Sequence, residues 1–302
     1  MYSCFVSATT RRQGRRAVWW AGALLAAATA SAPGYAAHPA HDELQVTDAA
    51  TDAALDRILA GAQRTAANRD RDAYRHPKAT LEFFGIRNDM NVMEVWPGKG
   101  GWWTEILAPL LREHGHYIAA HWDAKSEQTY YQEGLKAYRA KLAADPASYG
   151  KVEIVSLQYP NALSPVAPNT VDLALTFRNL HNWMATPDAA KATLSAIYTS
   201  LKPGGILGIE DHRASTTKPA DAQVKLGYVD EKATIELLRG IGFEYLGASE
   251  INANPKDTKD YEQGVWTLPP TYRLGEKDHD KYAAIGESDR FTLKFRKPSA
   301  GH

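Results

Sequence analysis

The chain has 302 residues, enough for one large domain or two small ones, since a domain usually holds roughly 100–200 residues. Hydrophobic residues make up 44% and charged residues 23% of it, which is typical of a folded protein and excludes wholesale disorder. Basic and acidic residues number 35 each, so no basic excess points to a nucleic-acid or membrane-surface partner. The single cysteine, Cys4, excludes an intramolecular disulfide and a zinc site built from cysteines.

Residues 1–36 have the layout of a secretory signal peptide. Four arginines and no acid precede an apolar stretch over residues 17–32, and small residues follow it. The stretch is shorter than the ~20 residues that span a membrane comfortably. We therefore predict an exported, periplasmic protein that is cut after Ala36. A cut after Ala32 and an uncleaved membrane anchor are the alternatives.

Loss of this segment changes the charge and the thiol content of the chain. The mature chain has a net charge of −4 and, without Cys4, no thiol, which suits an oxidising compartment. The run Arg15-Arg16-Ala17-Val18-Trp19 also resembles a twin-arginine signal, which exports folded proteins. Arginine-rich starts are common in ordinary signals too, so both export routes stay open. After cleavage we expect no stable membrane anchor.

Residues 37–69 are predicted to form a leader and a helix, and residues 70–302 a single domain. Apolar residues recur at helical spacing over 48–68. A second helix is expected from Pro77, which suits a first helical turn, to Gly85, which suits a helix end. No internal repeat or low-complexity tract divides the rest of the chain.

From residue 90 onwards, predicted strands and helices alternate. The strands are expected over 91–96, 117–120, 152–157, 171–177, 206–210, 243–247 and 291–296. The helices are expected over 102–113, 126–143, 187–201 and 230–239, the third with Thr186 as its N-cap. Such alternation predicts an α/β fold in which helices cover both faces of a mostly parallel sheet. Ligands of these sheets bind beyond the carboxyl ends of the strands, so functional residues are expected just after each strand.

A glycine-rich turn, Pro97-Gly98-Lys99-Gly100-Gly101, follows the first of these strands. Glycines let the backbone bend sharply and let a ligand come close to it. The helix beyond the turn presents free N–H groups that favour an anion. An acid, Glu94, precedes the turn. We predict a ligand-binding turn here, although a tight strand–helix turn without a ligand fits the same glycines.

Polar residues follow the strands predicted over 171–177 and 206–210. The first is followed by Arg178, Asn179, His181 and Asn182, and the second ends in Glu210, Asp211, His212 and Arg213. Because these two strands should be neighbours, His181 and His212 should face one another. Histidine is the commonest general base near neutral pH, and Asp211 is placed to orient one of the two.

The same residues allow other roles. The two histidines, Asp211 and His121 carry metal-ligand atoms, but they lack a close-spaced metal signature, so we predict no metal. Arg178 and Arg213 suit the binding of an acidic acceptor, or simple pairing with nearby carboxylates. Histidines with a purely structural role are the remaining alternative.

Several segments resemble class I S-adenosylmethionine-dependent methyltransferases. They are the strand and glycine-rich turn over 92–105, the strand over 171–175 and the turn over 201–207. Over about residues 70–298 the chain is more closely similar to a group of exported predicted methyltransferases, in the segments 76–86, 94–98, 177–183 and 250–257. The resemblance implies a Rossmann-like sheet of seven strands with the last one antiparallel, and S-adenosylmethionine as the cofactor.

The resemblance also assigns cofactor-binding residues, with two departures from the family pattern. It places Glu94, Trp96, Gly98 and Gly100 at the cofactor. Trp96 stands where the family has its first glycine, so its ring either displaces the cofactor or contacts the sulfonium, since aromatic faces attract cations. Trp102 and Trp103 either do the same or simply pack. His121 stands where the family has the acid that holds the ribose, and Asp123 is the predicted substitute.

The predicted function is methyl transfer from S-adenosylmethionine to a small-molecule acceptor, with His181, His212 and Asp211 as catalytic residues and no nucleic-acid partner. The long polar segment 252–289 is predicted to be a lid that shapes the acceptor pocket, or else a surface extension. The two departures, together with the cytoplasmic origin of the cofactor, favour an alternative: a non-catalytic exported ligand-binding protein on the same fold. A metal-dependent enzyme that uses the histidines is a further alternative.

Overall fold

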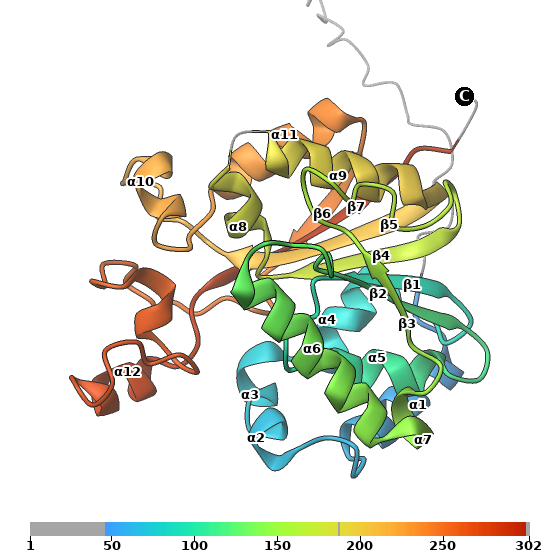
Figure 1. Ribbon diagram of the computed structural model, residues 1–302. Helices are drawn as coiled ribbons and strands as arrows, with labels where there is room; N and C mark the ends of the chain where they lie inside the picture. The colour runs from blue at the N-terminus through green and yellow to red at the C-terminus, as the bar shows by residue number, and fades with distance from the viewer. Residues whose placement is uncertain (1–45, 187, 300–302) are drawn as a thin grey trace, which may run out of the picture. The chain divides into compact units, whose positions relative to one another are not determined.

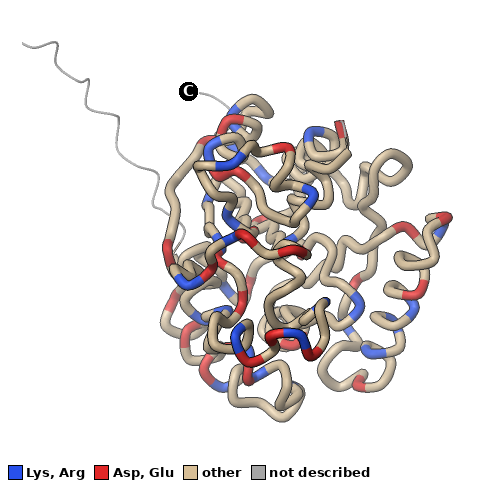
Figure 2. Tube along the Cα trace, turned by 90° about the vertical axis from the view of Figure 1, so that its left-hand side faces the viewer, with Lys and Arg blue, Asp and Glu red and all other residues tan. Residues whose placement is uncertain are grey.

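The computed structural model describes residues 46–186 and 188–299 of the chain. The predicted signal peptide and both of its cleavage sites lie outside the described residues. Within the described part, no helix has the length and apolar character needed to cross a membrane. Lys and Arg are interspersed with Asp and Glu along this part of the chain (Figure 2).

Seven strands form one sheet in the order β3-β2-β1-β4-β5-β7-β6 (Figure 1). Their bounds are β1 Asn91–Val95, β2 His116–His121, β3 Glu153–Ser156, β4 Val171–Phe177, β5 Leu201–His212, β6 Glu244–Ser249 and β7 Arg290–Arg296. Strands β1 to β5 pair in parallel, whereas β7 runs antiparallel to both β5 and β6. The predicted seven-stranded, mostly parallel sheet with an antiparallel last strand is confirmed.

Helices cover both faces of this sheet, as predicted. The longer ones are α1 Ala49–Leu59, α4 Pro77–Phe84, α5 Thr104–Leu111, α6 Thr129–Ala144, α9 Ala189–Ser200 and α11 Glu231–Ile241. The short ones are α2 Ala66–Arg69, α3 Asp72–Arg75, α7 Pro146–Tyr149, α8 Leu180–Met184, α10 Ala220–Val224, η1 Gly264–Thr267 and α12 His279–Ile285. Figure 1 shows α8, α9 and α11 on one face and α1, α4 and α5 on the other.

Strand β1 lies inside the sheet and divides the core into two clusters. Val92 belongs to the cluster under α1, α4 and α5, whereas Met93 and Val95 belong to the cluster under α8, α9 and α11. Side chains alternate between the two faces of a strand, and both faces are covered here, so the strand is apolar almost throughout. The exceptions are Asn91 at its start and Glu94, whose side chain is nevertheless buried.

The N-terminal helix is shorter than predicted. Sequence spacing predicted one helix over 48–68, but α1 ends at Leu59 and α2 is a separate short helix. Gly61, a poor helix former, lies between them. The side-chain amide of Gln63 donates to the carbonyl of Ile58 at 2.8 Å, which satisfies a carbonyl that a continued helix would have used.

Three further differences lie in the second half of the sheet. Helix α8 follows β4 almost directly and was missed, because five residues are too few to show a helical period. Helix α9 begins at Ala189 behind Asp188, so the predicted N-cap at Thr186 is wrong, and Pro187 lies outside the described residues. Strand β5 is longer than predicted at both ends, because β4 and β7 continue its hydrogen-bond ladder.

Gly208 in β5 allows α4 to lie close against the sheet. A Cβ atom on Gly208 would come within 2.7 Å of the ring of Phe84, whose side chain is fully buried. We expect Gly208→Ala to lower the free energy of unfolding by about 1–3 kcal/mol, because the ring has to move in a packed core. Urea denaturation followed by circular dichroism measures the change.

Gly240 in α11 provides the matched control, since no atom lies within 4 Å of the place of its Cβ. Gly240→Ala should leave stability unchanged or raise it by about 0.5–1 kcal/mol, because alanine suits a helix better than glycine does. Equal losses in the two variants, or no loss in Gly208→Ala, would contradict the close packing of α4 on β5.

Candidate active site

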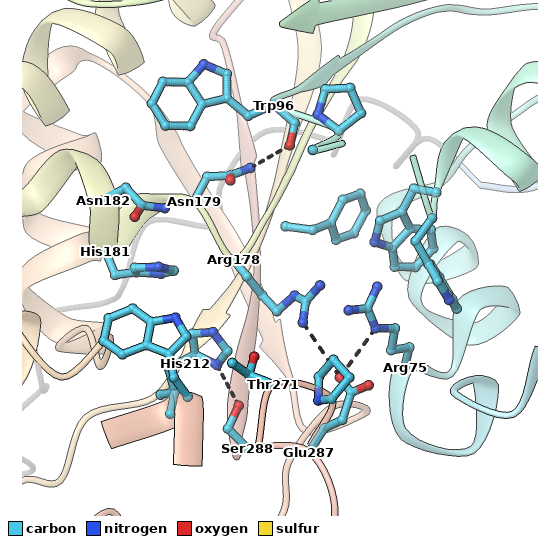
Figure 3. A pocket seen from close by; sticks show the side chains of 18 of the residues that line it. Arg75, Trp96, Arg178, Asn179, His181, Asn182, His212, Thr271, Glu287 and Ser288 are labelled. Carbon is cyan, nitrogen blue, oxygen red and sulfur yellow. Dashed lines mark hydrogen bonds and ion pairs between the residues drawn. The ribbon is translucent and has the colours of Figure 1, made fainter. Parts of the chain in front are cut away.

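A cavity of about 290 Å³ lies at the carboxyl ends of β1 and β4 and beside the end of β5 (Figure 3). This volume is close to the lower end of the range for small-molecule sites, roughly 300–1,000 Å³. The glycine-rich turn, the chain after β4 and His212 contribute to its wall. Trp266 and Thr271 belong to the wall too, so the segment predicted as a lid borders the cavity.

The predicted catalytic residues lie together: His181 and His212 line the cavity, and the fully buried Asp211 is hydrogen-bonded to both. His181 Nδ1 is 3.0 Å from Asp211 Oδ1, and Asp211 also accepts the backbone N–H groups of His181 and His212 at 3.2 Å and 2.7 Å. An ionised carboxylate only accepts hydrogen bonds, so the proton of neutral His181 belongs on Nδ1. Its Nε2 atom then carries a free lone pair, and in Figure 3 the ring points into the cavity.

His212 lies beside His181, with 5.3 Å between the ring centroids. Its Nδ1 atom is 2.5 Å from Oγ of Ser288, a wall residue that the sequence did not single out. Burial lowers the pKa of His212 well below its ordinary value, and the charges of nearby arginines lower it further. His212 is therefore neutral at neutral pH and serves as a hydrogen-bonding group.

The same three side chains could hold a metal ion. One ligand atom each from His181, Asp211 and His212 lies within 4.8 Å of the others, and all three residues are buried. Imidazole and carboxylate are suitable ligands for zinc and related ions. However, each of the three already has a hydrogen-bond partner within the protein, with which a metal would compete. His121, also considered as a ligand, is not part of this group.

Glu94 contributes a buried carboxyl group to the cavity wall. It accepts a hydrogen bond from the hydroxyl of Tyr117 at 2.5 Å. Burial raises the pKa of Glu94 to about 8, even though the bond from Tyr117 and the nearby Arg75 act in the opposite direction. The carboxyl group is therefore largely protonated at pH 7, and a cationic ligand beside it would favour its ionised form.

Trp96 is fixed in the core and leaves the cavity open. Its backbone has φ of +53°, and its indole N–H donates to the carbonyl of Leu157 at 2.7 Å. The ring packs edge-on against Trp122 and Trp183 with centroid distances of 6.0 and 5.6 Å. Trp96 thus forms part of the wall while most of its ring lies in the core under α8.

The glycine-rich turn presents bare backbone to the cavity at Gly98. Gly98 has φ of +72°, a conformation that favours glycine, and a Cβ there would meet no atom within 4 Å. Gly100 also faces open space but is not part of the cavity wall. His121 is fully buried, and its Nε2 atom lies 3.4 Å from the carbonyl of Gly98. Burial lowers the pKa of His121 to about 4, so its ring is neutral and holds the turn in place.

Asp123, the predicted substitute for the ribose-binding acid, lies away from the cavity wall. Its backbone N–H donates to the side chain of Gln158, and its carboxylate accepts the backbone N–H of Lys125. It lines a separate surface depression together with Gln158. Of the five predicted cofactor residues, the structure therefore brings Glu94, Trp96 and Gly98 together.

Two charged residues that the sequence did not single out, Arg75 and Glu287, complete the wall opposite the histidines. Figure 3 shows both Arg75 and Arg178 directed at Glu287. Arg213 instead pairs with Glu231, Glu250 and Asp289 and is not part of the wall. No local pattern marks Arg75 or Glu287, because they meet across more than 200 residues of chain.

No family model and no curated protein matches this chain. Among solved structures it is similar to a SAM dependent methyltransferase from Aquifex aeolicus, with 17% identity over 76% of this chain and 93% of that one and a TM-score of 0.48. The cyclase SpnF has 18% identity over 80% and 86%, with a TM-score of 0.50. An arsenic(III) S-adenosylmethionine methyltransferase from Chlamydomonas reinhardtii has 15% identity over 82% and 74%, with a TM-score of 0.47.

The chain has a Rossmann-like fold with a seven-stranded, mostly parallel sheet. The sequence resemblance implied seven strands with the last one antiparallel, and the structure adds that β7 lies between β5 and β6. At identities below one fifth the likeness concerns the fold, and folds of this kind host many reactions. The function of the cavity therefore depends on the residues that line it.

Because the pKa of Glu94 is raised, we expect Glu94 to make the stability of the protein depend on pH. Its pKa of about 8 in the folded state lies above the ~4.3 of an unperturbed glutamate. The contribution of Glu94 to stability is therefore complete below the pKa of the unfolded state and is lost as the pH rises through the pKa of the folded state. Because glutamine cannot ionise, the stability of Glu94→Gln relative to the wild type should rise between pH 5 and pH 8, by a few kcal/mol at most.

Urea denaturation of both proteins at several pH values measures that difference in stability. Titratable groups that the two proteins share contribute equally and drop out of the difference. Glu113→Gln is the control, since the Glu113 side chain is 67% exposed and its difference from the wild type should stay flat. A flat difference for Glu94→Gln as well would contradict a protonated, buried Glu94.

Proposed function

We propose that the protein is an S-adenosylmethionine-dependent methyltransferase that acts on a small-molecule acceptor. The observation that carries the proposal is the shared cavity: the His181–Asp211 pair and the backbone of Gly98 face the same space at the carboxyl edge of a class I methyltransferase fold. The His181–Asp211 pair supplies a base, and Gly98 supplies a place where a ligand can approach the backbone.

The wall residues fit the cofactor at three points. The buried carboxyl group of Glu94 would hold an ammonium group, which would also ionise it. Gly98 leaves room beside the turn. Trp103 and Phe177 stack 4.0 Å apart in the wall, and such rings attract a sulfonium by ~0.5–2 kcal/mol. When bound, the cofactor supplies an activated methyl group. The roles of Gly100 and Asp123 stay predictions.

His181 is placed to act on the acceptor. If the attacking atom begins protonated, Nε2 of His181 takes that proton while the atom forms its bond to the methyl carbon and the carbon–sulfur bond breaks. Asp211 keeps the Nδ1 proton in place and stabilises the imidazolium that results. His212, neutral and bonded to Ser288, lines the same space and can orient the acceptor.

Calorimetry with S-adenosylhomocysteine tests the cofactor. We expect saturable binding to the purified protein and a proton released from Glu94 near pH 7, which appears as a binding heat that depends on the buffer. Glu94→Gln should abolish the buffer dependence. If neither S-adenosylmethionine nor S-adenosylhomocysteine binds at concentrations on the order of 1 mM, the proposal is overturned.

Substitution of His181 tests the base. His181→Ala should lower the turnover number by about 10²–10⁴-fold while leaving the affinity for S-adenosylhomocysteine unchanged, because the ring acts on the acceptor. Transfer of a labelled methyl group to a panel of phenols, amines and acids gives the rate. His114→Gln, at an exposed position on the same chain, is the control. Full activity of His181→Ala would remove His181 from the mechanism.

Two side chains favour a second candidate, a ligand-binding protein without catalysis. Trp96, next to the glycine-rich turn, donates to the carbonyl of Leu157, and His121 lies 3.4 Å from the carbonyl of Gly98 within the turn. Native mass spectrometry separates the candidates: a retained nucleoside supports the methyltransferase, and an unrelated small molecule supports the binding protein. Elemental analysis of the same sample tests for a metal at His181, Asp211 and His212.

We also propose that the protein is exported to the periplasm after cleavage behind Ala36. The supporting observation is the signal-like composition of residues 1–36. Sequencing the N-terminus of protein recovered from the periplasmic fraction decides between this cut, a cut after Ala32 and an uncleaved anchor.

A further inference from the structure

A largely buried group of ionic side chains lies at the cavity wall around Glu287. Four arginines surround Glu287, whose side chain is only 3% exposed. Nitrogen atoms of Arg71, Arg75, Arg178 and Arg290 lie 2.6, 3.3, 3.8 and 3.1 Å from its carboxylate oxygens. Burial alone would raise the pKa of Glu287, but the arginines hold it well below its ordinary value. Glu287 is therefore ionised near neutral pH.

The charges of this group do not balance. Besides Glu287, Glu210 is the second acid of the cluster, and it is paired with Arg290. Four guanidinium groups thus meet two carboxylates, which leaves about two positive charges in a largely buried place. An unpaired buried charge is costly, so such an excess favours a negatively charged ligand.

Arg75 has an unused donor at the cavity. Its side chain is 2% exposed, it lines the cavity, and its Nη2 atom is buried without a hydrogen-bond partner. The guanidinium lies 4.6 Å from the ring of Trp102, which fixes its plane. In Figure 3 it faces the guanidinium of Arg178 across the space beside Glu287. Two like charges that face one another in a cavity are stabilised when an anion lies between them.

We propose that Arg75 and Arg178 bind a carboxylate group of the methyl acceptor, an inference that rests on the proposed methyltransferase function. Guanidinium groups match the planar, two-oxygen geometry of a carboxylate. The assignment to the acceptor follows from position. Arg178 precedes the base His181 by three residues, and Glu287 is next to Ser288, the partner of His212.

The rest of the wall indicates what the carboxylate is attached to. Besides Trp103 and Phe177, which we place at the sulfonium, Trp102 and Trp266 present aromatic surface to the same cavity. Flat apolar groups pack well against such rings. The acceptor is therefore an acid with a flat apolar body, oriented by the arginines so that its reacting atom lies toward His181. A cationic acceptor would be repelled by the excess positive charge.

Calorimetry with benzoate and benzamide, in the presence of saturating S-adenosylhomocysteine, tests the carboxylate site. The two probes share shape and differ in charge. Benzoate should bind at least about tenfold more tightly than benzamide, and Arg75→Met should remove that preference. Arg213→Met is the matched control, because Arg213 lies outside the cavity wall and its loss should leave benzoate binding unchanged. Equal affinities for the two probes, or no benzoate binding at millimolar concentration, would overturn the proposal.

Arg75→Lys serves if Arg75→Met does not fold, since it keeps the charge beside Glu287 but loses the planar fork. The other source of a carboxylate is the cofactor itself. If Arg75→Lys weakened S-adenosylhomocysteine and left 5′-methylthioadenosine, which has no carboxylate, unaffected, the site would belong to the cofactor and the proposal would be wrong. If the protein bound benzoate but neither S-adenosylhomocysteine nor 5′-methylthioadenosine, the carboxylate site would be supported and the proposed methyltransferase function would be wrong.

Discussion

Parallel pairing of β1, β4 and β5 brings the ends of three strands to one edge of the sheet, and the candidate site depends on it. Asp211 at the end of β5 accepts backbone N–H groups from its neighbour His212 and from His181 in α8. Through these bonds one buried carboxylate fixes the start of α8, the direction of the His181 ring and the position of its proton. Without the β4–β5 register, residues 30 positions apart in the chain could not share that group.

The electrostatics of the cavity divide it into regions of different character. Burial keeps Glu94 largely protonated near pH 7, so its part of the wall, beside the glycine-rich turn, carries little fixed charge before a ligand arrives. The arginines around Glu287 make another part of the same wall positive. Such a division suits two ligands with different charges, a cation beside Glu94 and an anion beside Arg75, with the His181 base at the same cavity.

Much of the fold was predictable from local patterns. Strand β4 was predicted with its observed bounds, and β1 to within one residue, because apolar runs bounded by turn residues identify buried strands. Helix α8 was missed, although it carries His181, since a five-residue helix has no periodicity to read. The helix predicted over 48–68 was too long because spacing alone does not show where a side chain such as Gln63 caps a carbonyl. Short polar contacts, unlike apolar periodicity, depend on the final geometry.

The sequence alone determined the sheet, its helical layers and the strand ends at which Glu94, Gly98, His181 and Asp211 lie, because these follow from periodicity and from glycine positions. Only the tertiary structure decided which polar residues share the cavity. It turned the ring of Trp96 toward Leu157, left Asp123 outside the wall, and brought Arg75 to Glu287 from more than 200 residues away. The physical reason is that burial and pairing of charges are set by the packing of distant segments, on which local sequence carries no information.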